Sequence, residues 1–399
     1  MTIPRRYIDT EPGELRRLLL ASGSKFSDPD CPDPVKEWES RFAAAIGRRA
    51  GIVTGSGRFA MKLILAGLKL PRGSEVIIPA YTLKDLVPLI TDLGLIPVTA
   101  DIDPDHWNVT AESINRRITA GTSAILVLHL FGNPAPMGQI MELARAKGLK
   151  VIEDCAHAAG SFLDDRPTGL LGDAAFFSFE SIKPINTYGG GMVVTDDPDL
   201  ETVIRQAAAD VEPAAPITAK VRAALFERFM FSTGLARIPL TILATKNGQQ
   251  LITRLYRLIQ PPPAKPKGYG PVQADLGLMR LKSLPARVEK RRRQAALLKA
   301  HLPDSCHPQG EIPGGKANYY FFVVKVRGDV NKIRKILLQN GYDAGIGAEI
   351  ADDCAAFTGD TDCPEAATLF DRALHLPLHE RLTDHQLTAM ADLLNRICV

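Results

Sequence analysis

The sequence predicts an α/β protein with a large domain, built on a mixed and mostly parallel sheet flanked by helices, and a smaller C-terminal α+β domain. The chain has 399 residues and is longer than the chains that a single hydrophobic core usually supports. From Glu75 onward, short apolar runs alternate with amphipathic helical segments. A proline-rich connector, residues 261–266, breaks any helix. We therefore place the large domain at residues 1–260 and the small domain at residues 267–399.

Residues 1–50 are predicted to form a polar arm followed by two helices. The segments GELRRLLLASG and VKEWESRFAAAIG both carry apolar residues at helical spacing. In the second segment Trp38, Phe42 and Ala45 share one face, which we interpret as a packing surface.

A glycine turn follows the first predicted strand, residues 51–54. It reads Gly55-Ser56-Gly57-Arg58 and leads into a helix over residues 59–65. The free backbone N–H groups at such a helix start suit a phosphate. Tight strand-to-helix turns also use glycine for conformational reasons alone, so the turn by itself leaves both interpretations open.

From Glu75 the pattern indicates strands and helices in alternation. The predicted segments are, in order, EVIIPAYT, LKDLVPLITDLG, LIPVTADID, AESINRRI, SAILVLHLFG and APMGQIMELARAKG. Such βαβ crossovers build a parallel or mixed sheet. His129 ends one of the apolar strands, and we interpret it as a hydrogen-bonded core residue.

Residue types suited to chemistry concentrate between residues 151 and 195. Asp154 follows a buried strand at its carboxyl end, where open α/β sheets bind ligands. A second apolar run, residues 174–179, leads to Lys183 and then to three glycines, residues 189–191. A lysine amine and a strand-end carboxylate are what a pyridoxal phosphate (PLP) site requires, one for the aldehyde and one for the ring nitrogen. The alternative is structural, because such an aspartate is often a helix cap and a loop lysine is usually solvated.

The order and spacing of four short motifs strengthen the PLP interpretation. The motifs are Glu153-Asp154-Cys155-Ala156-His157, Gly172-Asp173, Phe177-Ser178-Phe179-Glu180-Ser181-Ile182-Lys183 and Tyr188-Gly189-Gly190-Gly191. They resemble the signature of the DegT/DnrJ/StrS-type sugar aminotransferases, which are fold-type-I PLP-dependent enzymes. The resemblance extends over nearly the whole chain and implies the fold-type-I architecture, with a seven-stranded mixed sheet.

The resemblance also implies a role for each matching residue. Lys183 is implied to be the Schiff-base lysine, and Asp154 to hold the pyridinium nitrogen. Ser178 is implied to contact the cofactor phosphate, and His157 to lie beside the phenolic oxygen.

Two positions of the implied cofactor site depart from the family pattern. The phosphate-binding signature reads Ser56-Gly57-Arg58 here, so arginine replaces the family's threonine. Three roles are open for Arg58: it contacts the cofactor phosphate, it contacts the substrate, or it points to solvent. Leu83 stands where the family usually has an aromatic residue that stacks on the cofactor ring. Either Leu83 packs its aliphatic face on the ring, or Tyr81 substitutes for the aromatic, or the ring is held more loosely.

A basic and apolar segment, residues 214–260, stands where the family has a shorter crossover. This segment contains a single acidic residue, Glu227. Its basic residues are Lys220, Arg222, Arg228, Arg237, Lys246, Arg254 and Arg257. One interpretation is an interfacial helix that contacts an anionic membrane surface, with a lipid-linked substrate. The other is an apolar face that packs on a partner subunit or covers the substrate cleft, as amphipathic helices in enzymes mostly do.

The remaining segments predict the small domain. They are the helices at residues 272–278 and in SLPARVEKRRRQAALLKAHL, the strand NYYFFVVKV, the turn YDAGIG, and the helices VNKIRKILLQNG and DHQLTAMADLLNRI. We interpret the basic run 290–293 as a solvated helix face. The family's asparagine that reaches across the dimer is missing after Gly268-Tyr269-Gly270. His379 is interpreted as positional.

Composition excludes several classes of protein. Hydrophobic residues make up 45% and charged residues 23%, which is typical of a soluble globular protein, and the net charge of +3 is too small to indicate nucleic-acid binding. The six cysteines form no C-x-x-C pair, so we expect no metal site. Without a signal peptide or a spanning apolar run, we expect a cytoplasmic protein, at the inner face of the membrane if residues 214–260 bind lipid.

Taken together, these features predict a PLP-dependent aminotransferase. It would move an amino group from an amino acid, often glutamate in such enzymes, to a nucleotide-linked or lipid-linked keto-sugar. A homodimer is expected from the resemblance alone. One alternative is a PLP-dependent sugar dehydratase, although such relatives tend to carry histidine in place of Lys183. Another is a non-catalytic regulator or membrane-attached scaffold that kept the fold.

Overall fold

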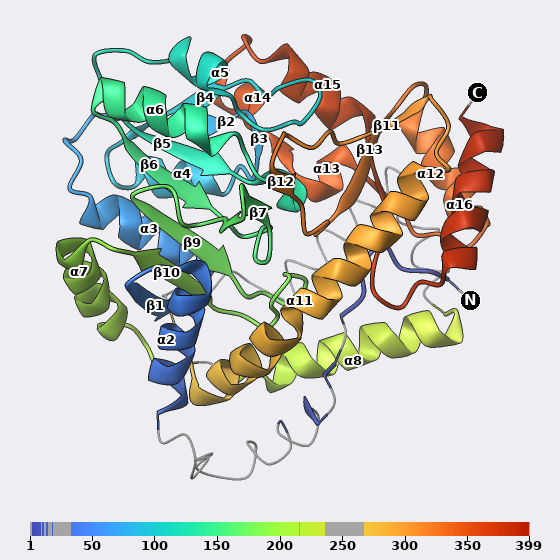
Figure 1. Cartoon of the computed structure of the whole chain (residues 1–399), viewed down its shortest axis with the longest axis horizontal. Coiled ribbons are helices and arrows are strands. Elements are labelled where there is room, and N and C mark those ends of the chain that lie inside the picture. Colours follow the sequence, from blue (N-terminus) through green and yellow to red (C-terminus); the bar gives the residue numbers. More distant parts are fainter. Residues whose placement is uncertain are drawn as a thin grey trace.

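The structure is a computed structural model in which helices cover both faces of a central sheet (Figure 1). It describes residues 2–8, 10–11, 13–14, 18, 33–214, 216–235 and 267–398. The predicted helix GELRRLLLASG lies mostly outside the described residues.

The central sheet has seven strands in the order β1-β10-β9-β6-β5-β2-β4. These strands are β1 Ala50–Thr54, β10 Gly191–Thr195, β9 Ala174–Ser178, β6 Lys150–Asp154, β5 Thr122–Leu128, β2 Glu75–Pro79 and β4 Ile96–Ala100. The pairs from β9 to β4 are parallel, whereas β10 runs antiparallel to both of its neighbours. The predicted mixed, mostly parallel sheet is therefore confirmed.

Consecutive residues of β9 pack into different layers, as the two-residue period of a strand requires. Phe176 joins the cluster formed with α3, α4 and α7. Phe177 joins the cluster on the other face, formed with α2 and the long helix α11. A further cluster on this second face contains residues of α5 and α6. These helices are α2 Pro34–Ile46, α3 Gly57–Gly67, α4 Leu86–Thr91, α5 Ala111–Asn115, α6 Met137–Lys147, α7 Pro198–Ala209 and α11 Pro271–Lys299.

A smaller four-stranded sheet, in the order β11-β13-β16-β14, lies in the C-terminal part of the chain. Its elements and the helices around it are β11 Cys306–Pro308, β13 Phe322–Val326, α12 Val330–Gln339, β14 Gly345–Ile346, α13 Gly347–Ile350, α14 Cys354–Thr358, α15 Pro364–Arg372, β16 Ala373–Leu376 and α16 Asp384–Ile397. Short pairs tie it to the large sheet region: β3 Tyr81–Thr82 with β15 Asp352–Asp353, and β12 Gly315–Lys316 with β7 Phe162–Leu163, which in turn pairs with β8 Arg166–Pro167.

Helix α11 joins the two parts of the molecule. The two helices predicted in this region are one continuous helix, with Pro285 inside it. Gly277 and Pro285 lower the helical tendency of the sequence, but packing outweighs them. Leu284 contributes to the cluster around Trp38, whereas Leu298 belongs to the core of the small sheet. The division at residues 260 and 267 stays a prediction.

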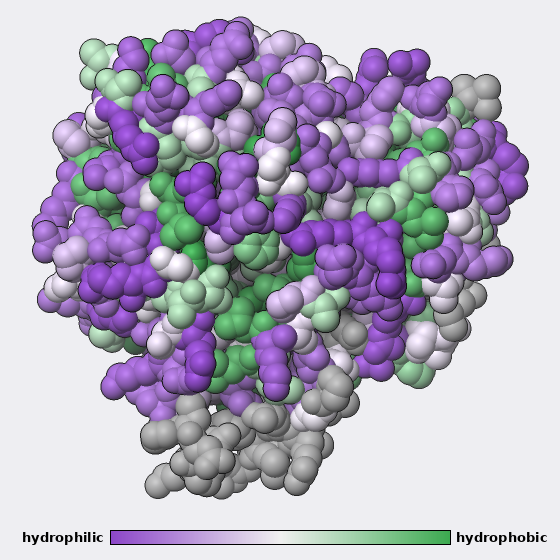
Figure 2. Space-filling view, viewed as in Figure 1, coloured by the Kyte–Doolittle hydropathy of each residue, from purple (hydrophilic) through white to green (hydrophobic). Residues whose placement is uncertain are grey.

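The segment 214–260 is described only through residue 235, with residue 215 excepted. Its described part forms α8, Thr218–Thr233, which buries Val221 and Ala224 against Tyr188 and Leu276. The other side of α8 exposes Phe226 by 64% and Phe229 by 55%. Within the described part of the chain, no helix is both long enough and apolar enough to cross a bilayer. Polar residues cover much of the face shown in Figure 2.

Candidate functional site

Two parallel neighbouring strands deliver the central side chains of the site. Asp154, the last residue of β6, lies opposite Phe176 of β9, and Ser178 ends β9 two residues later. The chain then turns and places Lys183 beyond the same edge of the sheet, where its backbone N–H donates to the carbonyl of Glu180. The sheet topology thus brings together the carboxylate and the amine that the sequence singled out.

The charges of Asp154 and Lys183 act on each other. Burial lowers the pKa of Lys183 to about 8, against the opposing attraction of Asp154. Burial raises the pKa of Asp154 to about 6, although the Ala156 N–H and the charge of Lys183 favour its ionised form. The Ala156 N–H donates to Oδ1 of Asp154 over 2.9 Å. Both groups therefore change protonation state much closer to neutral pH than ordinary Asp and Lys side chains do.

Tyr320, just before β13, places an aromatic ring beside both Lys183 and His157. The Lys183 Nζ lies 5.0 Å from the centroid of the Tyr320 ring, in cation–π geometry. The His157 ring stacks on Tyr320 with centroids 4.5 Å apart, and its Nδ1 accepts from the Phe131 N–H at 3.3 Å. Burial, with a contribution from Lys183, keeps the pKa of His157 well below its ordinary value, so its ring is neutral at pH 7.

Sequence reasoning did not identify Tyr320. The run NYYFFVVKV predicted a strand, and nothing in its periodicity distinguished this tyrosine from its neighbours. Its approach to Lys183 depends on how the small sheet packs against the large one. An aromatic doublet at the start of a strand is the only signal that the sequence offered.

A close approach of backbone at the start of α3 forms a cradle near Ser178. A Cβ added to Gly57 would lie 2.9 Å from the Cβ of Ser178, so glycine is required for this approach. Ser56 caps α3 by accepting from the Phe59 N–H at 3.2 Å. Gly190, at φ 102°, lies against the ring of Tyr269 and forms a bridge with Ser56. The predicted residues Ser56, Gly57 and Ser178 are thus neighbours.

Arg58 and Leu83 lie at the periphery of this cradle. Arg58 forms an ion pair with Asp85, with more than half of each side chain exposed to solvent, which favours the solvent-facing role among those left open. Leu83 is 41% exposed. Tyr81 has no exposed surface, and its hydroxyl donates to the Gly347 carbonyl at 3.4 Å. Its ring is therefore not available to a cofactor, and the substitution of Tyr81 for the missing aromatic is wrong.

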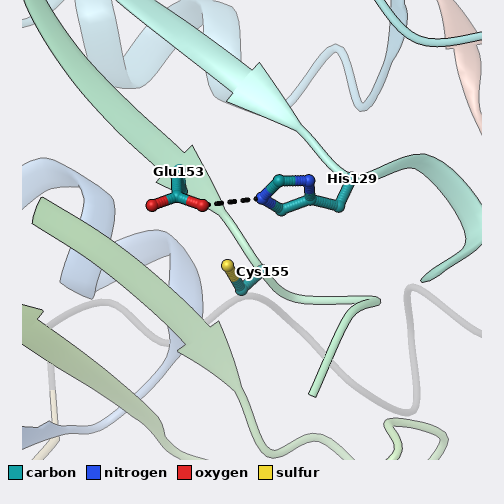
Figure 3. Close-up of side chains that lie close together, drawn as sticks. All are labelled: His129, Glu153 and Cys155. Atoms are coloured by element: carbon teal, nitrogen blue, oxygen red, sulfur yellow. Dashed lines mark hydrogen bonds and ion pairs between the residues drawn. The ribbon is translucent and has the colours of Figure 1, made fainter. Parts of the chain in front are cut away.

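His129, Glu153 and Cys155 form a buried cluster next to the site (Figure 3). The Ala135 N–H donates to Nδ1 of His129 at 3.0 Å, so Nε2 carries the proton that it donates to Glu153, also at 3.0 Å. Burial raises the pKa of the Cys155 thiol. With both ring nitrogens engaged and the thiol protonated, this cluster does not suit a metal ion. The prediction that His129 is a hydrogen-bonded core residue is confirmed.

Glu153 organises the loop that follows the short pair β7 and β8. Its carboxylate accepts from the N–H groups of Gly169, Leu171 and Gly172 at 2.9, 2.7 and 2.6 Å, in addition to His129. Burial opposes its charge, but the bonds from His129 and the loop outweigh burial and lower its pKa.

We expect Glu153→Ala to lower the free energy of unfolding by about 3–5 kcal/mol, because it leaves several buried donors without an acceptor. Chemical denaturation at pH 7 measures the change. The exposed Glu142→Ala on α6 is the control and should change stability by less than about 0.5 kcal/mol. Equal effects of the two substitutions would contradict the structural role of Glu153.

Comparison with known proteins gives a family match to the parts of the sequence before and after α8. The model of the DegT/DnrJ/EryC1/StrS aminotransferase family matches residues 31–210 and 271–395. The chain is 39% identical over 166 residues to the GDP-perosamine synthase of Escherichia coli O157:H7. That alignment covers 42% of this chain and 46% of the relative, so the match spans about half of the relative's length.

Solved structures extend the similarity to the whole chain. The structure of DesI in the presence of its TDP-sugar product is 25% identical, with a TM-score of 0.75, and the match covers 100% of this chain and 93% of DesI. The PLP form of a sugar aminotransferase from Streptococcus pneumoniae is 19% identical, with a TM-score of 0.76, covering 100% of this chain and 98% of the other. The second likeness supports the fold alone.

Proposed function

Because the chain belongs to the DegT/DnrJ/EryC1/StrS aminotransferase family, we propose that it is a PLP-dependent aminotransferase acting on a keto-sugar. The amino donor in this proposal is an amino acid, glutamate first among them. The observation that carries the proposal is the pair Asp154 and Lys183, brought to one edge of the sheet with pKa values of about 6 and about 8.

The residues present fit PLP. The cradle formed by Ser56, Gly57 and Ser178 suits a phosphate, because the close backbone approach at Gly57 and the start of α3 direct N–H groups to one place. Asp154 would hold the ring nitrogen, and Lys183 would hold the aldehyde carbon. When bound, PLP supplies an aldehyde that reacts with amines and a ring that accepts electrons.

The side chains around Lys183 prepare its amine for proton transfer. With a pKa of about 8, roughly a tenth of the amine is neutral at pH 7, and the ammonium form gives up its proton at lower cost than an ordinary lysine does. The Lys183 amine lies over the ring of Tyr320, and the neutral His157 stacks on that same ring. Asp154 is mostly ionised at pH 7 and supplies the negative charge that a protonated ring nitrogen requires.

A single-turnover experiment separates this proposal from the alternatives. Protein loaded with PLP and given glutamate without acceptor should release one equivalent of 2-oxoglutarate per site. A regulator or scaffold would release none. A dehydratase is distinguished by its sugar product, which would lose water and gain no amino group, and Lys183 argues against it.

The sugar acceptor is either nucleotide-linked or lipid-linked. The relatives named above favour a nucleotide-linked sugar, since one is called a GDP-perosamine synthase and another was solved with a TDP-sugar product. The exposed Phe226 and Phe229 on α8, with the cation of Arg222, favour a membrane surface and hence a lipid-linked sugar. Dimer formation remains a prediction.

Liposome co-sedimentation tests the membrane alternative. The protein should sediment with anionic vesicles more than with neutral ones, and replacing both Phe226 and Phe229 by Asp should weaken this binding about tenfold or more. Phe357→Asp, on α14, is the control, because Phe357 is 56% exposed at a different surface. If the unaltered protein does not sediment with anionic vesicles, the lipid-linked acceptor is rejected in favour of the nucleotide-linked one.

A further inference from the structure

A pocket opens near Lys183 where five segments that are distant in the sequence meet. It is lined by Arg6, Tyr7 and Ile8 from the N-terminal arm, Ile182, Arg291 of α11, Tyr320, Phe321, Leu378 and His379. Ile182 precedes Lys183 in the chain, and Tyr320 is the ring over which the Lys183 amine lies. The pocket is therefore close to the amine.

The N-terminal arm is held in this pocket by α8. The guanidinium of Arg228 donates to the Thr10 hydroxyl at 2.9 Å and lies 6.0 Å from the centroid of the Tyr7 ring. Ile8 packs in the same cluster as Val221 and Ala224 of α8. Both segments fall outside the residues that the family model matches, 31–210 and 271–395. The arm and α8 thus combine at one wall of the pocket.

Arg6 offers the pocket an available cation. Its side chain is exposed, and no carboxylate of the described residues forms an ion pair with it. Burial is the main reason why the pKa of Lys183 is low, and the positive charge of Arg6 adds to the effect, which indicates that the two cations are close. The second arginine, Arg291, is 2.9 Å from Glu380 and is already neutralised.

His379 adds an independent indication of a ligand. The side chain is 4% exposed and lines the pocket, yet within the described residues neither ring nitrogen has a hydrogen bond of normal geometry. Burial lowers its pKa to about 4, so the ring is neutral at pH 7, although the Pro4 carbonyl favours the protonated form. A neutral imidazole offers one donor and one acceptor, and a buried ring whose nitrogens lack well-formed hydrogen bonds is costly.

We propose that this pocket is the anion subsite of the active site, in which Arg6 binds a carboxylate or phosphate group of the substrate with the help of His379. The inference rests on the proposed function and adds the chemistry by which a substrate is recognised. Arginine suits both anions because its planar fork donates two parallel hydrogen bonds to their oxygens. Ile8, Ile182 and Leu378 leave the rest of the pocket apolar, which suits one anionic group better than a sugar ring.

The carboxylate would come from the amino donor, and the phosphate from a diphosphate-linked acceptor. Titration calorimetry on the cofactor-loaded protein distinguishes these sources with two probes, glutarate and pyrophosphate. At least one probe should bind, and Arg6→Gln should raise its Kd about tenfold to a hundredfold, the loss of one charge-assisted contact. Arg293→Gln, an exposed arginine of α11, is the matched control and should leave the Kd unchanged.

Two outcomes would overturn the inference. One is that neither probe binds, and the other is that Arg293→Gln weakens binding as much as Arg6→Gln. Neither outcome depends on turnover. Failure of the proposed function would be seen separately, as absence of 2-oxoglutarate release from glutamate by a protein that still binds the probes through Arg6.

The role of α8 is tested at Arg228, a positioning residue. Arg228→Gln should raise the Kd of the same probe about threefold to tenfold, and Arg228→Lys should restore part of the loss by keeping a cation over Tyr7. Arg222→Gln, exposed on the same helix, is the control. Equal Kd values for Arg228→Gln and Arg222→Gln would show that α8 does not position the arm.

Discussion

Replacing Lys183 by alanine should abolish amino transfer and remove the visible absorption of the lysine-bound cofactor. Its amine is the only one that the described structure places over the Tyr320 ring and within electrostatic reach of Asp154. General acid–base catalysis by a positioned group contributes about 10²–10⁴-fold, so the loss of activity should be at least about 10²-fold. Absorption spectra and 2-oxoglutarate release from glutamate measure the two effects.

The control for this substitution is Lys147→Ala, at an exposed lysine near the end of α6, which should retain colour and activity. The ionisation of Lys183 can be checked in the cofactor-free protein. Burial lowers its pKa, so an amine-selective reagent should modify residue 183 increasingly up to about pH 8 and at a constant rate above it. A yellow, active Lys183→Ala protein would refute the assignment.

The strand ends of the site could be predicted because they depend on local patterns. An apolar run followed by an acid marks the end of a buried strand, and parallel neighbouring strands such as β6 and β9 end at the same edge of the sheet. Asp154, Ser178 and Lys183 were accessible to such reasoning, and the motif resemblance gave them roles. The sequence alone did not decide between a phosphate-binding and a purely conformational role for Gly57, because its close approach to Ser178 depends on tertiary packing.

The wall of the site opposite these strand ends could not be predicted. Tyr320 precedes β13 and His379 follows β16 of the small sheet, whereas Arg6 lies in an arm that carries no periodic pattern. Their meeting depends on packing between segments that are far apart in the sequence. The loss of Tyr81 as a candidate has the same origin, since its burial depends on Gly347 and Phe131.

Cofactor chemistry and stability make opposite demands on Asp154. The unfolded chain ionises this group near the ordinary value of 3.8, whereas burial in the folded protein raises its pKa to about 6. The folded state therefore binds more protons than the unfolded state between these two values, and this group makes the cofactor-free protein less stable as pH rises from about 4 to 6. Above pH 6 the buried Asp154 carboxylate is ionised and lowers the stability of the folded protein.

Asp154→Asn should consequently lower activity without lowering the stability of the folded protein. The amide keeps an oxygen for the Ala156 N–H but cannot carry the charge that holds a protonated ring nitrogen, so amino transfer should fall about 10²–10³-fold. The pKa of Lys183 should fall below about 8, because the attraction of the Asp154 charge raises it at present. Steady-state kinetics and the pH dependence of Lys183 modification measure these two effects.

Above pH 6 the cofactor-free Asp154→Asn protein should unfold at the same or a higher denaturant concentration than the unaltered protein, since a buried charge has been removed. Asp371→Asn, exposed on α15, should change neither activity nor stability. A loss of activity accompanied by an equal loss of stability would indicate that Asp154 supports the fold and not the cofactor. A stable but inactive protein indicates instead that the charge is kept for chemistry, because the fold itself gains nothing from it.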